Sequence, residues 1–121
     1  MSIKYSIENK KKYLFVKSHG KSNDLDEVSR YAREITELCK GQGHKNILID
    51  ETHRQYVLDE VLDLYKLATF FKTLDISSLR IAIICHPKYL EHIHFLETTA
   101  NNRGMNIKFF LEFDSAKRWL L

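Results

Sequence analysis

Length, composition and charge restrict the class of protein. The chain has 121 residues, 44% hydrophobic and 29% charged, with four glycines and one proline. This indicates one ordered domain over residues 1–121, whose core needs neither a metal nor a disulfide. Its 19 basic and 16 acidic residues are interspersed and leave a net charge of only +3, which does not indicate nucleic-acid binding.

The sequence indicates a soluble cytoplasmic protein. No stretch reaches the roughly 18 consecutive apolar residues that span a bilayer, so we expect no transmembrane segment. The N-terminal MSIKYSIENKKK lacks the apolar core of a signal peptide. Cys39 and Cys85 have no CxxC spacing and lie in apolar patterns, as do buried, reduced thiols in cytosolic proteins.

The N-terminal third predicts a hairpin and then a helix. Apolar residues at 3, 5 and 7 alternate with polar ones, which indicates an edge strand, and the turn residues 9–12 lead into a second strand at 13–16. From Asp24 the period becomes helical, with acidic residues in the first turn and Gly41 just beyond the end. One face of this helix is apolar: Leu25, Val28, Ala32, Ile35 and Cys39.

The rest of the chain alternates strands with helices. The expected elements are a buried strand at 47–49, a polar elbow at 50–54, a helix striped by Val57, Val61, Leu64, Ala68 and Phe71, a strand at 79–85, a helix opened by Pro87 and ended by Gly104, a strand at 107–111, and a short helix with Ala116, Trp119 and Leu120. The order ββαβαβαβα predicts an α/β fold with a mainly parallel five-stranded sheet, right-handed crossovers and an antiparallel N-terminal edge strand.

The ending ANNRGMNIKFFLEFDSAKRWLL and the stretch LIDET resemble SpoIIAA-like domains of the STAS type, which are named from sulfate transporters and anti-sigma-factor antagonists. The order of elements resembles this family over essentially the whole chain. The resemblance implies a domain that works by binding, and a strand-three elbow that in the antagonists holds an Asp-Ser-Ser-Gly-like motif with a phosphorylated serine. Here the elbow reads Asp50 to Arg54 without Ser or Gly, so we expect the familiar phosphoswitch to be absent. Thr52, the only hydroxyl there, reads as a turn or capping residue.

The strand ends supply candidate ligand-binding residues. Ligands of open parallel sheets collect beyond the carboxyl ends of the strands, where this sequence places Asp50 on one strand and Cys85 and His86 on the next. Asp50 and His86 are therefore ligand-binding candidates. An enzyme using Asp50, His53 and His86 remains an alternative, although Cys85 reads as a core thiol and we assign no catalytic residue.

Neither a metal nor a cofactor is expected. In EHIHFLE, His92 and His94 are two positions apart and face different sides of a helix, so they cannot chelate one ion. No glycine-rich phosphate loop is present. The lysines at 10–12 read as solvated edge protection.

The second helix has more apolar surface than one packed face requires, with Leu58 and Leu62 on one flank. The third helix likewise points Phe95 away from its own apolar stripe. The sheet face opposite the crossover helices also needs a cover, which the terminal helix, a second copy of the protein or an apolar ligand could supply. We expect a non-enzymatic interaction or signalling domain that binds a protein partner or itself as a homodimer. Its predicted contacts are Glu51, His53 and Arg54 as polar contacts and Leu58 and Leu62 as apolar anchors. A carrier of a small apolar ligand or lipid, with a cavity beside helix two, is the first alternative.

Overall fold

The computed structural model describes most of the chain. The described residues are 3–22, 25–56, 66, 69–70, 73–74, 78–102 and 104–121. Along them the elements follow in the order β1 (Lys4–Asn9), β2 (Leu14–Ser22), α1 (Leu25–Gly41), β3 (Asn46–Tyr56), β4 (Arg80–Ile84), the 3-10 turn η1 (Pro87–Tyr89), α3 (Leu90–Asn102), β5 (Asn106–Phe110) and α4 (Phe113–Leu120). The apolar stripe expected for the second helix, from Val57 to Phe71, lies outside the described residues.

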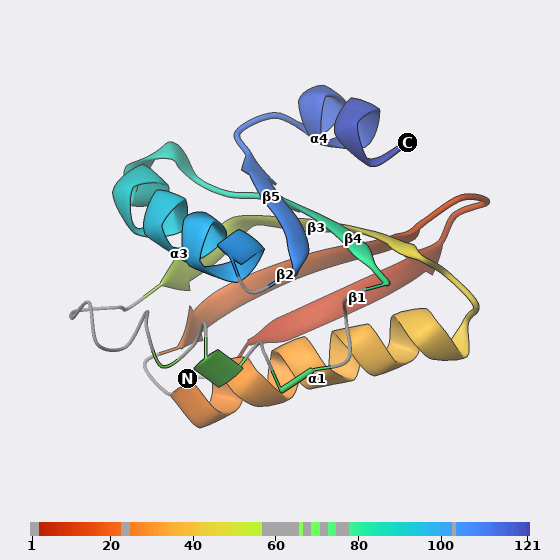
Figure 1. Ribbon diagram of the computed structural model, residues 1–121, viewed down its shortest axis with the longest axis horizontal. Helices are drawn as coiled ribbons and strands as arrows, with labels where there is room; N and C mark the ends of the chain where they lie inside the picture. Colours follow the sequence, from red (N-terminus) through yellow and green to blue (C-terminus); the bar gives the residue numbers. More distant parts are fainter. Residues whose placement is uncertain are drawn as a thin grey trace.

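The strands form one sheet in the order β1-β2-β3-β4-β5 (Figure 1). β1 is antiparallel to β2, and the other neighbours are parallel. The predicted α/β architecture with an antiparallel N-terminal edge strand is therefore confirmed. No helix among the described residues is long and apolar enough to cross a bilayer.

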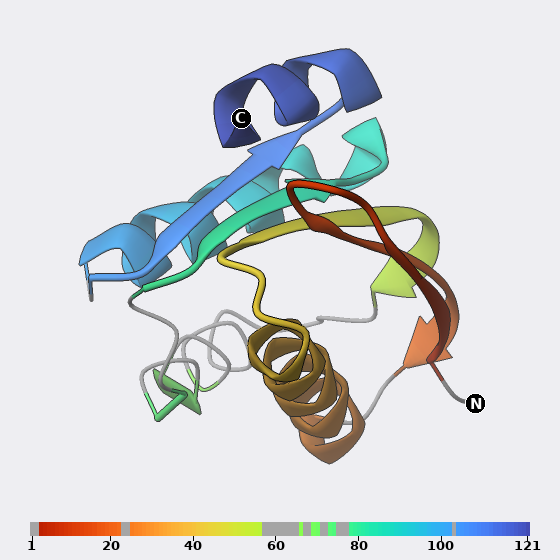
Figure 2. The same ribbon diagram turned by 90° about the vertical axis from the view of Figure 1, so that its right-hand side faces the viewer.

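Each face of the sheet has its own core. On one face α1 and α3 pack against the strands through a cluster that includes Leu14, Ile35, Ile47 and Ala100. On the other face α4 packs through Ala116 and Leu120 against a second cluster from β3 and β4. Figure 2 shows α4 and α1 on opposite sides of the sheet. Of the three covers considered for this second face, the terminal helix is the one that lies over β3 and β4.

Local sequence explains where the helices begin and end. α1 has Asp26 and Glu27 in its first turn, where carboxylates are favourable beside the helix dipole. Pro87 opens η1, which continues into α3. α3 ends in a Schellman arrangement: Gly104 has a φ of 84°, and the Met105 N–H donates to the Ala100 carbonyl at 3.2 Å. The positive φ explains why glycine follows this helix.

The third strand differs from the prediction. A strand of three apolar residues followed by an elbow was expected, but β3 runs through Asp50 to Arg54 and ends at Tyr56. The expected elbow is therefore wrong. Pairing with β2 continues past Asp50, with His19 opposite His53. This pairing keeps a polar stretch extended, although its local sequence does not favour a strand.

The docking of α4 depends on Trp119. The Trp119 ring lies 5.8 Å from the Phe110 ring, and the Arg80 guanidinium lies 4.2 Å above the Trp119 ring centroid. Arg80 also donates a hydrogen bond to the Trp119 carbonyl. One arginine at the start of β4 thus holds both the side chain and the backbone of the last helix.

We expect Trp119→Ala to lower the free energy of unfolding by about 2 kcal/mol, less than for a fully buried Trp because this ring is half-buried. Urea denaturation followed by circular dichroism measures the change. Arg118→Ala, on the exposed side of the same helix, is the control and should change stability by less than about 0.5 kcal/mol. Equal losses from the two variants would contradict this role of Trp119.

Candidate functional site at the carboxyl end of the parallel strands

A β-bulge shapes the end of β3. Lys17 pairs with Asp50 but His19 pairs with His53, so Glu51 and Thr52 together lie opposite Ser18. The Asp50 carboxylate accepts hydrogen bonds from both the backbone N–H and the hydroxyl of Thr52. These bonds within the strand stabilise the extra residue.

The bulge is accompanied by a buried polar network on the α1 side. The Tyr31 hydroxyl, from α1, donates to Glu51 Oε2 at 2.9 Å and lies 2.7 Å from the Ser18 hydroxyl. Arg54 Nη1 donates to the same Glu51 oxygen at 3.0 Å, and the guanidinium lies 5.2 Å from the Tyr31 ring centroid. All four side chains are buried. The network joins β2, β3 and α1 at one point in the interior.

The electrostatics of this network favour a structural role. Burial, followed by the nearby Glu51 carboxylate, raises the pKa of Tyr31 well above its ordinary value. The phenol therefore stays protonated and remains a hydrogen-bond donor to Glu51. The Glu51 and Arg54 charges lie 3.0 Å apart with exposed side-chain fractions of 6% and 4%, so each compensates for the desolvation of the other.

Cys85 lies beside this network, just after β4. Burial, followed by the nearby carboxylates of Glu51 and Glu97, raises the pKa of Cys85 to about 11. Burial likewise raises the pKa of Cys39 to about 11. Both cysteines are free thiols and buried. The interpretation of both as buried core residues is confirmed, and a raised pKa is the opposite of what a nucleophilic cysteine requires.

The predicted partner-contact residues do not share one environment. His53 is exposed, whereas Glu51 and Arg54 are each only 5% exposed. The expectation of exposed polar side chains is therefore met by His53 alone, because the bulge in β3 turns both Glu51 and Arg54 toward Tyr31. Leu58 and Leu62 lie outside the described residues. Whether any of the five contacts a partner stays a prediction.

The two ligand-binding candidates are engaged locally. Asp50 accepts the two bonds from Thr52, and the His86 Nδ1 accepts a hydrogen bond from the Lys88 N–H at 3.1 Å. His86 also lies edge-on to Tyr89, with ring centroids 6.5 Å apart. His86 is therefore the N-cap of η1. A ligand-binding role for Asp50 and His86 stays a prediction.

The histidines of α3 lie on its surface. His92 and His94 are exposed, and Phe95 is also 37% exposed on the same helix. Within the described residues, three or more His, Cys, Asp or Glu side chains do not come together as a metal would require. The cavity expected beside the second helix falls outside the described residues.

Sequence reasoning did not find Ser18 and Tyr31 as members of the site. Tyr31 lies on the apolar stripe of α1, four residues before Ile35, and Ser18 continues the inward alternation of Leu14 and Val16. A polar side chain on an otherwise apolar face was the available signal. Its partners were hidden because Glu51 is 20 residues away from Tyr31.

Comparison with solved structures identifies the fold. An anti-sigma factor antagonist from Mycobacterium paratuberculosis superposes with a TM-score of 0.65 at 13% identity, covering 98% of this chain and 94% of that one. An uncharacterised protein from Shewanella loihica, described as having a SpoIIAA-like fold, gives a TM-score of 0.56 at 21% identity, covering 99% and 94%. The fold is SpoIIAA-like. No protein-family model matches the sequence, and neither does any curated protein.

Substitutions can measure how much the buried pair of Glu51 and Arg54 contributes to the free energy of unfolding. Glu51→Ala leaves a buried arginine charge and should lower the free energy of unfolding by about 3 to 5 kcal/mol. Replacing both Glu51 and Arg54 with methionine removes both charges and should cost clearly less. Chemical denaturation of the two variants beside exposed Glu37→Ala measures this. A double variant as unstable as Glu51→Ala would show that the pair is not the source of the effect.

The pKa values of the thiols predict slow alkylation. At pH 8 a thiol with a pKa of about 11 is ionised in roughly one molecule in a thousand. We expect the folded protein to react with iodoacetamide about a hundredfold more slowly than the urea-unfolded chain, and the rate to rise with pH up to about 11. Mass spectrometry counts the modified cysteines. Equal rates in the folded and unfolded chain would contradict the raised pKa values.

Proposed function

We propose that this SpoIIAA-like domain is a non-enzymatic regulatory module that acts by binding a protein partner or a second copy of itself. The observation that carries the proposal is the buried network at the carboxyl end of the strands. Enzymes with open parallel sheets place reactive groups there. Here Ser18, Tyr31, Glu51 and Arg54 are directed at one another in the interior, while His53 on the same strand is directed outward.

Two further points support binding over chemistry. The thiol beside the network has a pKa raised to about 11, which disfavours a cysteine nucleophile at neutral pH. An anti-sigma factor antagonist has the same fold over 94% of its length, and such a protein acts on another protein, as its name states. The fold therefore serves partner binding in at least one protein of similar size.

The proposed contact surface is built around His53. This side chain is exposed on a strand whose inner side is fixed by the buried pair, so the surface is rigid before a partner arrives. Leu58 and Leu62 are proposed as apolar anchors that follow it in sequence. Glu51 and Arg54 are proposed to act on the surface from within, by fixing β3.

Site-specific photo-crosslinking in the host cell tests this function. A benzophenone amino acid in place of His53 should give a discrete adduct, either with a second copy of the chain or with one other protein. The same group in place of Glu37, an exposed residue of α1, is the control and should give none. Leu58→Asp combined with Leu62→Asp should abolish the adduct without unfolding the domain. A complete lack of adducts from the His53 position would contradict the proposal.

A further inference from the structure

Three basic side chains, one lysine and two histidines, lie in one row across the sheet. Lys4 of β1 pairs with His19 of β2, and His19 pairs in turn with His53 of β3. Residues paired in this way point to the same face. All three are exposed. They lie on the face opposite Tyr31, because Ser18 and Arg54, their neighbours along the strands, are directed inward to Tyr31 and Glu51.

A second row lies beside the first. Ser6 pairs with Lys17, and Lys17 pairs with Asp50. Lys17 is exposed, and Phe15, two residues before it, packs edge-on against Phe113 of α4 with ring centroids 6.0 Å apart. Beyond Phe15, the same face of β1, β2 and the end of β3 has exposed side chains at Lys4, Lys17, His19 and His53, with Asp50 opposite Lys17. We call the surface formed by these four exposed residues the basic face.

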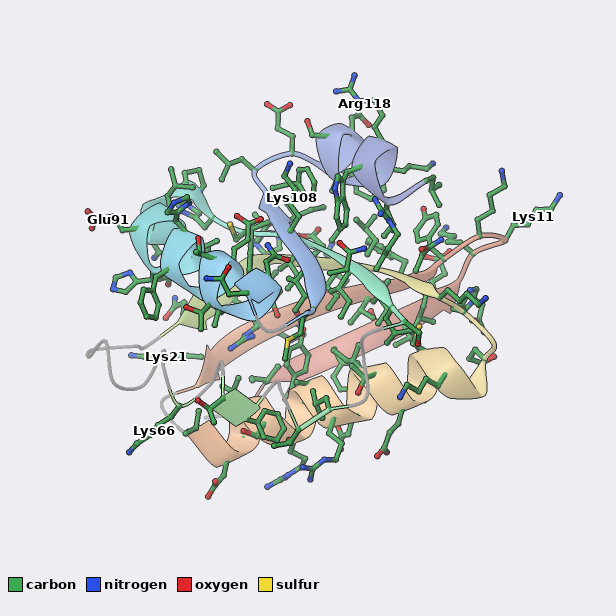
Figure 3. The ribbon with its side chains drawn as sticks, viewed as in Figure 1. Lys11, Lys21, Lys66, Glu91, Lys108 and Arg118 are labelled. Atoms are coloured by element: carbon green, nitrogen blue, oxygen red, sulfur yellow. The ribbon has the colours of Figure 1, made fainter. Side chains whose placement is uncertain are left out.

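Charge is concentrated in the hairpin that forms this face. Residues 3–22 contain six lysines and one glutamate, a charge of +5 in a chain whose net charge is +3. That glutamate, Glu8, is paired with Lys10 at 2.9 Å. Figure 3 shows Lys11 at the hairpin tip and Lys21 toward the other end of β2. β2 has nine residues and so extends over about 30 Å.

We propose that the basic face binds an extended acidic segment of a protein partner. This inference rests on the proposed function and gives it a location and a partner chemistry. In an extended segment, alternate side chains repeat every ~6.6 Å, as do Lys17 and His19 along β2. Carboxylates at alternate positions can therefore lie opposite Lys17 and His19, and complementarity with the lysine charges would also speed association.

The chemistry of the face favours an acidic peptide over nucleic acid or a membrane. Sheets that bind single-stranded nucleic acid stack bases on several exposed aromatic rings. On this face Tyr13, just before β2, is buried, and Phe15 is packed on Phe113 of α4, which is 40% exposed at the edge of the face. Membrane docking needs apolar side chains beside the lysines. The apolar residues of β1 point to the other face, where Ile7 pairs with Val16.

Fluorescence anisotropy at low salt tests the proposal. The probe is a labelled eight-residue peptide of alternating glutamate and serine, with the glutamine-serine peptide as its uncharged reference. We expect the wild-type chain to bind the acidic peptide only, and Lys4→Glu with Lys17→Glu to weaken binding at least about tenfold. Lys40→Glu with Lys45→Glu makes the same change in net charge at exposed positions away from this face and should have a much smaller effect.

The remaining outcomes separate this inference from the proposed function. Failure of the acidic peptide to bind, or equal weakening in the two double variants, would show that the basic face is not the site. Tighter binding of oligothymidylate or of phosphatidylserine vesicles, lost in Lys4→Glu with Lys17→Glu, would assign the face to nucleic acid or to a membrane. If a protein adduct forms at position 53 but the peptide does not bind, the proposed function stands and this inference falls. If the peptide binds but no adduct forms at position 53, the proposed function falls, whereas binding of acidic peptides by the basic face stands.

Discussion

The buried pair of Glu51 and Arg54 is the constraint on which the centre of this structure depends. Two charges with 6% and 4% of their side-chain surface exposed depend on each other and on neighbouring hydrogen-bonding groups for compensation. One Glu51 oxygen accepts from both Arg54 and Tyr31, and the Tyr31 hydroxyl also contacts Ser18. The partners come from β2, β3 and α1, so these elements must be in register before the charges are compensated. Compensation of the pair therefore requires the native arrangement of these elements.

The bulge in β3 and the buried pair require each other. Without the extra residue, the alternation of β3 would direct residues 51 and 54 to opposite faces, because they differ by an odd number of positions. With Glu51 and Thr52 both opposite Ser18, Glu51 and Arg54 point to the same side. The hydrogen bonds from Thr52 to Asp50 then hold the bulge on its outer side. A local irregularity therefore allows a nonlocal ion pair to form.

Periodicity predicted most of the fold, because its signal is repeated in many residues. The alternation at 3–7, the stripe of α1 and the Trp119 helix each express burial on one face, and the order of the elements then restricts the topology. Periodicity failed at residues 50–55, where the buried side chains are polar. Tyr31 donates to Glu51 from 20 residues away, and no local pattern encodes such a partner. The rows on the basic face could not be predicted from the sequence either, since only the strand register aligns Lys4 with His19 and His19 with His53.

The same strand register explains how outward side chains can be substituted without disturbing the interior. Along the end of β3, Arg54 points inward to the buried pair, while His53 and Gln55 are exposed. Substitutions at the outward positions change charge and shape on the basic face without removing a member of the network. The backbone beneath them is held by pairing with β2 and by the buried pair, so an exposed side chain there loses little further backbone freedom on binding. A partner segment that lies along β2 would then meet side chains whose spacing is set before contact, which makes the spacing of its own charges, rather than their number alone, the basis of selection.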